Sequence, residues 1–167
     1  STAIAVSRDS RFLYVGRFTN PRAIGIWDVS AIPGGPAVLV NSVPNPSPHQ
    51  GQNIGDIAFS LDGTKAYVAT GRLHVLDTGT QAYIPGKTFL PLTGTSTTPL
   101  PVGLDVTPDG AFVYAASGNA SGTKEVVVVD TQTDQQVAYV PVTHGMRDVA
   151  IAGNRAFAVT YAQTGLN

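Results

Sequence analysis

The chain has 167 residues, of which only 13% are charged, with a net charge of −1 and no cysteine. This balance argues against an electrostatic nucleic-acid binder, because no basic stripe is available to neutralise phosphates. The lack of cysteine excludes disulfides and thiolate metal sites. A hydrophobic content of 43% argues against disorder, and no apolar run approaches the roughly 20 residues that span a bilayer.

One hairpin recurs along the chain, three times in full and once shortened. Its versions read SRDSRFLYVGR, SLDGTKAYVAT, TPDGAFVYAAS and AGNRAFAVT. An aromatic ring occupies the same place in each version, at Tyr14, Tyr67, Tyr114 and Phe157, with separations of 53, 47 and 43 residues. A period of about 40 to 50 residues filled with short strands is typical of a β-propeller blade.

Each module predicts four strands, A to D. Strand A is rich in small residues and is expected at 3–6, 56–59, 103–106 and 148–151. A turn leads to strand B, which carries the aromatic ring and is expected at 12–16, 65–70, 112–117 and 155–160. Strand C ends in an aspartate, at Asp28, Asp77 and Asp130, and the less regular strand D is expected at 37–43, 87–92 and 135–142. No helical stretch of about 10 residues separates these strands.

The strings SLDGTKAYVAT, TPDGAFVYAAS and VVVVDTQTDQQVAYVPV resemble the YVTN family of β-propeller repeats. The resemblance covers nearly the whole chain and implies an all-β propeller of four-stranded antiparallel blades. It further implies a ring of about seven blades, of which about three and a half are present: 1–46, 54–98, 101–143 and a half blade at 147–167. The family includes bacterial and archaeal cell-surface proteins, and related propellers include lactonases, amine dehydrogenase subunits and nitrous oxide reductase.

An open arc exposes the apolar faces and unpaired strand edges of its end blades. We therefore expect the missing blades to come from a longer polypeptide, of which this chain is a piece. A less favoured alternative is that other chains complete the ring. Two copies do not make seven blades, because both would contribute an A–B half and neither a C–D half.

Candidate site residues lie in the loops that join D to A and B to C. In propellers of the kind that the chain resembles, ligands gather on the face carrying these loops, near the central axis. The polar residues expected there are His49, Asp56, His144, Arg147 and Asp148, with Arg17, Asn20 and Asn119 further out. A His/Asp cluster at a channel mouth is suited to hold a divalent metal or to transfer protons. We favour loop polar groups that hydrogen-bond strand ends, because these residues lack any diagnostic spacing.

Asp105 is a separate candidate, because Ala5, Ala58 and Ala150 occupy its place in the other modules. A carboxylate without partners would be costly on the crowded innermost strand, so it either reaches a donor or a channel water, or has a functional role. The regularly repeated aspartates that end strand C are predicted to bond the backbone of the C–D turn. His74 and Trp27 are predicted to be packing residues.

Two functions remain open at this point. The favoured one is a non-catalytic scaffold of an exported or cell-surface protein, which binds protein or glycan through its loop faces and needs no cofactor. The alternative is a propeller enzyme or electron-transfer subunit, such as a lactonase-like hydrolase or a metal-dependent oxidoreductase, with its site at the channel mouth. The sequence contains no GxSxG elbow, P-loop, dinucleotide fingerprint, HExxH or CxxCH motif.

Overall fold

The computed structural model describes residues 3–18, 21–47, 50–89, 101–117 and 124–160. Within these ranges the chain forms three four-stranded antiparallel sheets and one two-stranded sheet, with no helix. The prediction of an all-β, partial propeller is confirmed. A membrane-crossing helix is likewise not found in the part of the chain that the structure describes.

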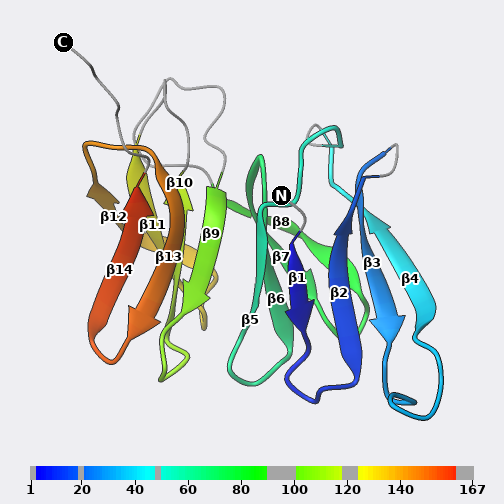
Figure 1. Ribbon diagram of the computed structural model, residues 1–167. Coiled ribbons are helices and arrows are strands. Elements are labelled where there is room, and N and C mark those ends of the chain that lie inside the picture. The colour runs from blue at the N-terminus through cyan, green and yellow to red at the C-terminus, as the bar shows by residue number, and fades with distance from the viewer. Residues whose placement is uncertain (1–2, 19–20, 48–49, 90–100, 118–123, 161–167) are drawn as a thin grey trace, which may run out of the picture.

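The strands follow one another in each sheet in the order of the sequence, and the sheets lie side by side as a fan (Figure 1). Blade 1 comprises β1 (Ile4–Val6), β2 (Phe12–Arg17), β3 (Ala23–Asp28) and β4 (Val38–Pro44). Blade 2 comprises β5 (Asp56–Phe59), β6 (Lys65–Thr70), β7 (Arg72–Asp77) and β8 (Ala82–Phe89). Blade 3 comprises β9 (Pro101–Val106), β10 (Phe112–Ser117), β11 (Glu125–Asp130) and β12 (Gln135–Pro141). The half-blade comprises β13 (Met146–Ala152) and β14 (Arg155–Thr160).

One strand lies elsewhere than the sequence predicts. The outer strand of blade 2 was expected at 87–92, whereas β8 begins at Ala82, and residues 90–100 lie outside the described part. Its segment AYIPGKTF contains Pro85 and Gly86, which favour a break over a strand. The sheet accommodates them where its register shifts, between the pairs His74–Thr88 and Leu76–Tyr83. Because β8 is an outer strand, the missing proline N–H removes no bond from a central ladder.

The core consists of the contacts between neighbouring blades. The strand-B aromatic ring of each blade faces the blade that follows it in sequence. Tyr14 packs among residues of blade 2 and meets Phe59 edge to face, with ring centroids 5.0 Å apart, and Tyr67 packs against Leu104 and Val113 of blade 3. Burying a side chain of this kind stabilises the fold by about 1.5–3 kcal/mol, so each blade depends on its neighbour.

Each complete blade also has a bulge where its outer strand pairs with strand C. In blade 1 the register shifts between Ile26 and Trp27, and in blade 3 it shifts between Val128 and Val129. Val40 and Val137 are consequently the extra residues of the outer strands, with no residue directly opposite. Bulges of this type bend a strand and increase its twist.

The turns between strands A and B share one hydrogen-bonding pattern. In blade 2, Asp62 accepts a hydrogen bond from the Ser60 hydroxyl at 2.6 Å and another from the Thr64 N–H at 3.0 Å. Asp9 and Asp109 make the equivalent bonds in blades 1 and 3. The turns that the sequence predicts between strands A and B are thus stabilised by aspartate side chains.

Candidate functional site

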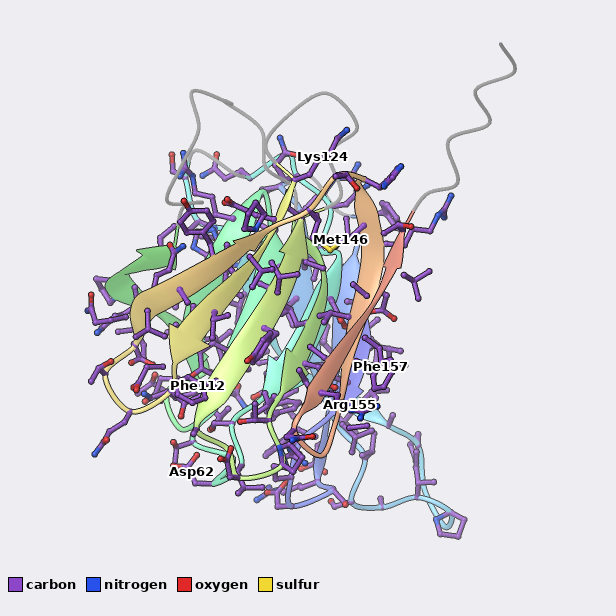
Figure 2. The ribbon with its side chains drawn as sticks, turned by 90° about the vertical axis from the view of Figure 1, so that its left-hand side faces the viewer. Asp62, Phe112, Lys124, Met146, Arg155 and Phe157 are labelled. Carbon is purple, nitrogen blue, oxygen red and sulfur yellow. The ribbon has the colours of Figure 1, made fainter. Side chains whose placement is uncertain are left out.

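The inner strands β1, β5, β9 and β13 lie next to one another along the inside of the fan (Figure 1). Three of the candidate carboxylates, Asp56, Asp105 and Asp148, belong to these strands. Figure 2 shows the two ends of the blades, with Lys124 and Met146 near the end of the B–C and D–A loops and Asp62 and Arg155 near the A–B turns.

Asp56 connects the inner strands of blades 2 and 3. Its Oδ1 accepts a hydrogen bond from the N–H of Ile57 at 2.8 Å, and its Oδ2 accepts one from the N–H of Leu104 on β9, also at 2.8 Å. Burial raises the pKa of Asp56, and the charges of Asp148 and Asp105 act in the same direction, against the two backbone bonds. Both oxygens of this carboxylate are thus engaged by main-chain donors.

Asp105 makes the same kind of connection one blade further on. Its Oδ1 accepts from the N–H of Val106 at 2.8 Å, and its Oδ2 accepts from the N–H of Ile151 on β13 at 2.6 Å. The expectation that this carboxylate must reach a donor is met by a backbone group of the next blade. We refer to Asp56 and Asp105 as the interblade clamps, because each joins its own inner strand to the following one.

Asp148 repeats the local half of this arrangement. Its Oδ1 accepts from the N–H of Val149 at 2.8 Å, and the residue is exposed. Gly103, which occupies the equivalent position in blade 3, lies directly against it: a Cβ atom on Gly103 would approach the Cα of Asp148 to 2.6 Å. Glycine at this position therefore allows β9 and β13 to lie as close together as they do.

The other predicted site residues that the structure describes lie at the loop end of the blades. His144 is exposed, and its Nδ1 lies 2.8 Å from the Thr143 hydroxyl. Arg147 is also exposed, and Arg17 donates to the Ser42 hydroxyl at 3.3 Å. In the described part of the chain, no three or more His, Cys, Asp or Glu side chains are placed to hold a metal ion. The remaining predicted residues, His49, Asn20 and Asn119, lie outside the described residues.

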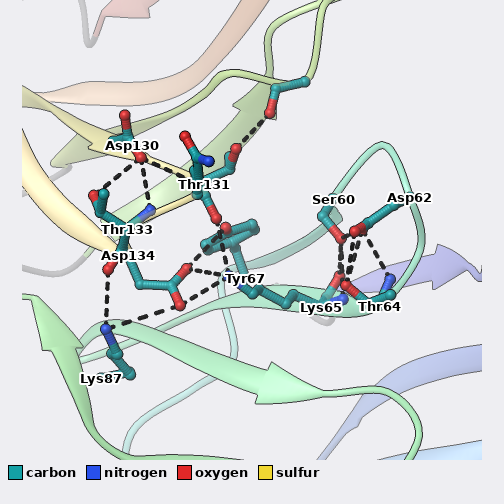
Figure 3. Close-up of polar contacts among 12 residues, drawn as sticks. Ser60, Asp62, Thr64, Lys65, Tyr67, Lys87, Asp130, Thr131, Thr133 and Asp134 are labelled. Carbon is teal, nitrogen blue, oxygen red and sulfur yellow. Dashed lines mark hydrogen bonds and ion pairs between the residues drawn. The ribbon is translucent and has the colours of Figure 1, made fainter.

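Reasoning from sequence missed Asp134, the centre of a polar network between blades 2 and 3 (Figure 3). Lys65 Nζ lies 2.8 Å from both carboxylate oxygens of Asp134, and the Tyr67 hydroxyl donates to Oδ1 at 3.3 Å. Lys87 Nζ lies 3.9 Å from Oδ2. Burial, together with the charge of Asp134, raises the pKa of Tyr67. One signal was present in the sequence: Lys65 stands where the other full modules have Phe12 and Phe112.

The aspartates that end strand C bond their own C–D turns, as predicted. Asp28 accepts from the N–H of Ser30 at 2.9 Å, Asp77 from Thr80 at 2.7 Å and Asp130 from Thr133 at 2.8 Å. The hydrogen bonds that these carboxylates accept lower the pKa of all three. They stabilise the turns and do not converge on a shared site.

His74 and Trp27 differ in how well they fit their predicted packing roles. His74 is buried, with its Nδ1 3.1 Å from the Thr88 hydroxyl and its ring edge to face with Tyr83 at 5.6 Å. Trp27 is only half-buried, although the equivalent Leu76 is fully buried. Leu76 faces blade 1, whereas no blade in the described part of the chain lies against the side of blade 1 that carries Trp27.

Grooves open between neighbouring blades at the A–B turns, the end opposite to the predicted ligand face. One lies between blades 2 and 3, with Leu61, Asp62 and Gly110 in its lining. Another lies between blades 1 and 2, with Arg8 and Gly63 in the corresponding places. The recurrence indicates that these hollows are a product of blade packing.

Comparisons with known proteins support the fold. No family model and no curated protein sequence matches the chain. Among solved structures, it is similar to Kuenenia stuttgartiensis hydrazine synthase, with a TM-score of 0.70 and 21% identity over 89% of this chain and 39% of that one. It is also similar to a proposed 6-phosphogluconolactonase of Bacteroides uniformis, with a TM-score of 0.69 and 16% identity over 93% of this chain and 46% of that one. The chain thus spans less than half the length of these proteins, and the likeness establishes a propeller-like fold.

Proposed function

We propose that the chain is part of a non-catalytic propeller scaffold of an exported or cell-surface protein, which binds protein or glycan through its loop face. We further propose that it is a divergent relative of the YVTN repeats, whose motif its hairpins resemble. The observation that carries the functional proposal is the state of the interblade clamps. Both carboxylate oxygens of Asp56 and of Asp105 accept hydrogen bonds from main-chain N–H groups. The carboxylates with the most favourable position for catalysis therefore serve to hold neighbouring strands together.

The loop face also presents an exposed aromatic group suited to recognition. Phe18, next to the end of β2, is 63% exposed, and the Arg22 guanidinium lies 4.8 Å from the centre of its ring. Arg22 is held in turn by a hydrogen bond to the carbonyl of Gly51 at 3.1 Å. Aromatic and arginine side chains are the residues most enriched at energetically important protein interfaces, and a flat aromatic face also suits a sugar ring.

Binding is tested with the purified chain on a panel of defined polysaccharides and immobilised surface proteins. Phe18→Ser is expected to weaken any specific binding about tenfold or more, since roughly 1.4 kcal/mol corresponds to a factor of ten. Leu61→Ser is the matched control, because Leu61 is also an exposed apolar residue (53%) but lies at the A–B turns. Equal binding by both variants would contradict the assignment of the loop face.

The enzyme alternative has its own experiment. We expect no stoichiometric metal in the purified protein by elemental analysis, and no hydrolysis of simple lactones above background. His49→Ala and His144→Ala serve as controls for either signal. Bound metal that is lost in these variants, or lactone turnover that they abolish, would replace the scaffold with a catalytic propeller.

A further inference from the structure

The charged side chains of the molecule are divided unequally between the two ends of the blades. The structure describes all 10 lysines and arginines and all 11 aspartates and glutamates of the chain. The aspartates of the A–B turns and those that end the C strands lie at the turn end. The cations at the loop end, where the B–C and D–A loops lie, are Arg17, Arg22, Arg72, Lys124 and Arg147. Of the carboxylates at the loop end, Glu125 is buried, Asp56 bonds two main-chain N–H groups, and Asp148 is exposed. The loop end is therefore the basic end of the molecule.

The cations of the two ends also differ in the groups that they bond. At the turn end, the Arg11 guanidinium lies 3.1 Å from a carboxylate oxygen of Asp28. At the loop end, the half-buried side chains of Arg22 and Lys124 instead donate to main-chain carbonyls, at 3.1 Å and 3.4 Å. A carbonyl oxygen carries no net charge, so these bonds hold the two side chains in place without neutralising them.

Arg22 and Phe18 form a pair that the D–A loop between blades 1 and 2 holds in position. The N–H of Arg22 donates to the carbonyl of Gln50 at 3.0 Å, and its carbonyl accepts from the N–H of Asn45 at 2.8 Å. The Arg22 guanidinium lies 4.8 Å from the centre of the Phe18 ring, and Phe18 is 63% exposed. Because Nε makes the bond to Gly51, the two terminal nitrogens of the guanidinium are suited to donate to a planar anion such as a carboxylate. An apolar plane and a planar cation thus lie next to each other.

We infer that the ligand of the loop face is an acidic polysaccharide, whose sugar ring packs on Phe18 and whose carboxylate accepts from Arg22. Lys124 lies at the same end of blade 3 (Figure 2) and attracts the charges of further sugar units. The inference rests on the binding role proposed above for the loop face and names its ligand class. An acidic protein segment would meet the same charges without a sugar ring for Phe18, and a neutral glycan would leave the cations unused.

The test compares three polymers by isothermal titration calorimetry with the purified chain. Polygalacturonate carries a carboxylate on each sugar, its fully methyl-esterified form has the same backbone without the charge, and poly-L-glutamate has the charge without the sugar. Polygalacturonate is expected to bind about tenfold or more tightly than either of the others, since loss of a charge-assisted hydrogen bond or of the aromatic contact corresponds to about that factor. Raising the salt concentration from about 0.05 M to about 0.5 M is expected to weaken this binding, because salt screens exposed charges.

Three variants locate the binding. Arg22→Gln is expected to weaken polygalacturonate binding about tenfold while leaving binding of the methyl ester unchanged, and Lys124→Gln is expected to weaken it about twofold to threefold. Arg155→Gln is the matched control, because Arg155 is an exposed cation near the A–B turns (Figure 2), and it is expected to change nothing.

The outcomes separate this inference from the proposed binding role of the loop face. Equal binding of polygalacturonate and its methyl ester, with both weakened by Phe18→Ser, would overturn the acidic ligand but keep a glycan-binding loop face. Binding of poly-L-glutamate as tight as that of polygalacturonate would overturn it in favour of an acidic protein partner. Absence of polygalacturonate binding, or equal losses in Arg22→Gln and Arg155→Gln, would also overturn it.

Discussion

Blade 2 and the half-blade are built from the same repeat but differ in what surrounds them. In blade 2, Tyr67 is fully buried, whereas Phe157 at the same position of the half-blade is 55% exposed. Every residue of β6 except Lys65 is buried, and every residue of β14 is exposed. The residues of a blade are therefore buried by the neighbouring blades. The free energy of unfolding of this arc is accordingly close to a sum over contacts between adjacent units.

The largest expected effect comes from removing the same ring in both places. Tyr67→Ala should lower the free energy of unfolding by about 3–5 kcal/mol, as is usual for deleting a fully buried aromatic side chain. Phe157→Ala should change it by about 0.5 kcal/mol or less, because most of its ring already meets water. Urea unfolding followed by far-UV circular dichroism, at concentrations where the chain is monomeric, measures both. Equal losses would show that the half-blade is covered in solution.

A smaller loss is expected from the network between blades 2 and 3. Asp134→Ala leaves Lys65 and the Tyr67 hydroxyl without their shared acceptor, and should destabilise the protein by about 2–4 kcal/mol. Arg11→Ala is the comparison, because the Arg11–Asp28 pair is solvent-accessible, at 58% and 20% of the side chains, and its loss should destabilise the protein much less than Asp134→Ala does. Chemical denaturation of the two variants measures both losses of unfolding free energy and shows whether the buried pair contributes more than the exposed one.

Two carboxylates of the inner strands, Asp105 and Asp148, should also differ, because Asp105 bonds the next blade whereas the bond of Asp148 lies within its own strand. Asp105→Asn weakens the charged acceptor for the N–H of Ile151 and should cost about 1–2 kcal/mol. Asp148→Asn should leave the unfolding free energy almost unchanged, because Asp148 is exposed and accepts its hydrogen bond from Val149 of its own strand. Hydrogen exchange at the Ile151 amide provides a local readout. Unaltered protection of that amide in Asp105→Asn would contradict the clamp.

The smallest effect concerns acid stability. The turn aspartates, such as Asp62 and Asp77, accept hydrogen bonds that lower their pKa values below 3.8. Their contribution to the free energy of unfolding is therefore lost as the pH falls through these lowered pKa values. Asp56 has a pKa raised above 3.8, mainly by burial, so its folded form holds the proton more tightly and gains relative stability as the pH falls. Asp56→Asn removes that gain, and its stability should therefore decline more steeply on acidification. Urea unfolding at a series of pH values measures how the free energy of unfolding changes with pH. If this free energy falls no more steeply in Asp56→Asn than in the wild type, the pKa of Asp56 is not raised by folding.

The repeat predicts the fold well because its signals are local. The turn between strands A and B and the aspartate that ends strand C each act within one blade, and the strand-B aromatic ring recurs at a fixed place in every blade. Asp134 and the clamp partners were not predicted, because Lys65 and Asp134, or Asp56 and Leu104, meet across blades. The sequence gives no measure of how one blade is rotated against the next. Trp27 fails for a related reason, since its burial depends on a neighbour that the repeat cannot specify.

The bulges of the outer strands determine how this molecule can associate. A strand at the edge of a sheet is a template for pairing with another chain, and a bulge that twists the edge removes that template. Val40 and Val137 interrupt the outer strands of blades 1 and 3 in this way, and Pro85 with Gly86 does so in blade 2. The circumference of the arc is thereby protected against sheet extension, which is the route to fibrous aggregation.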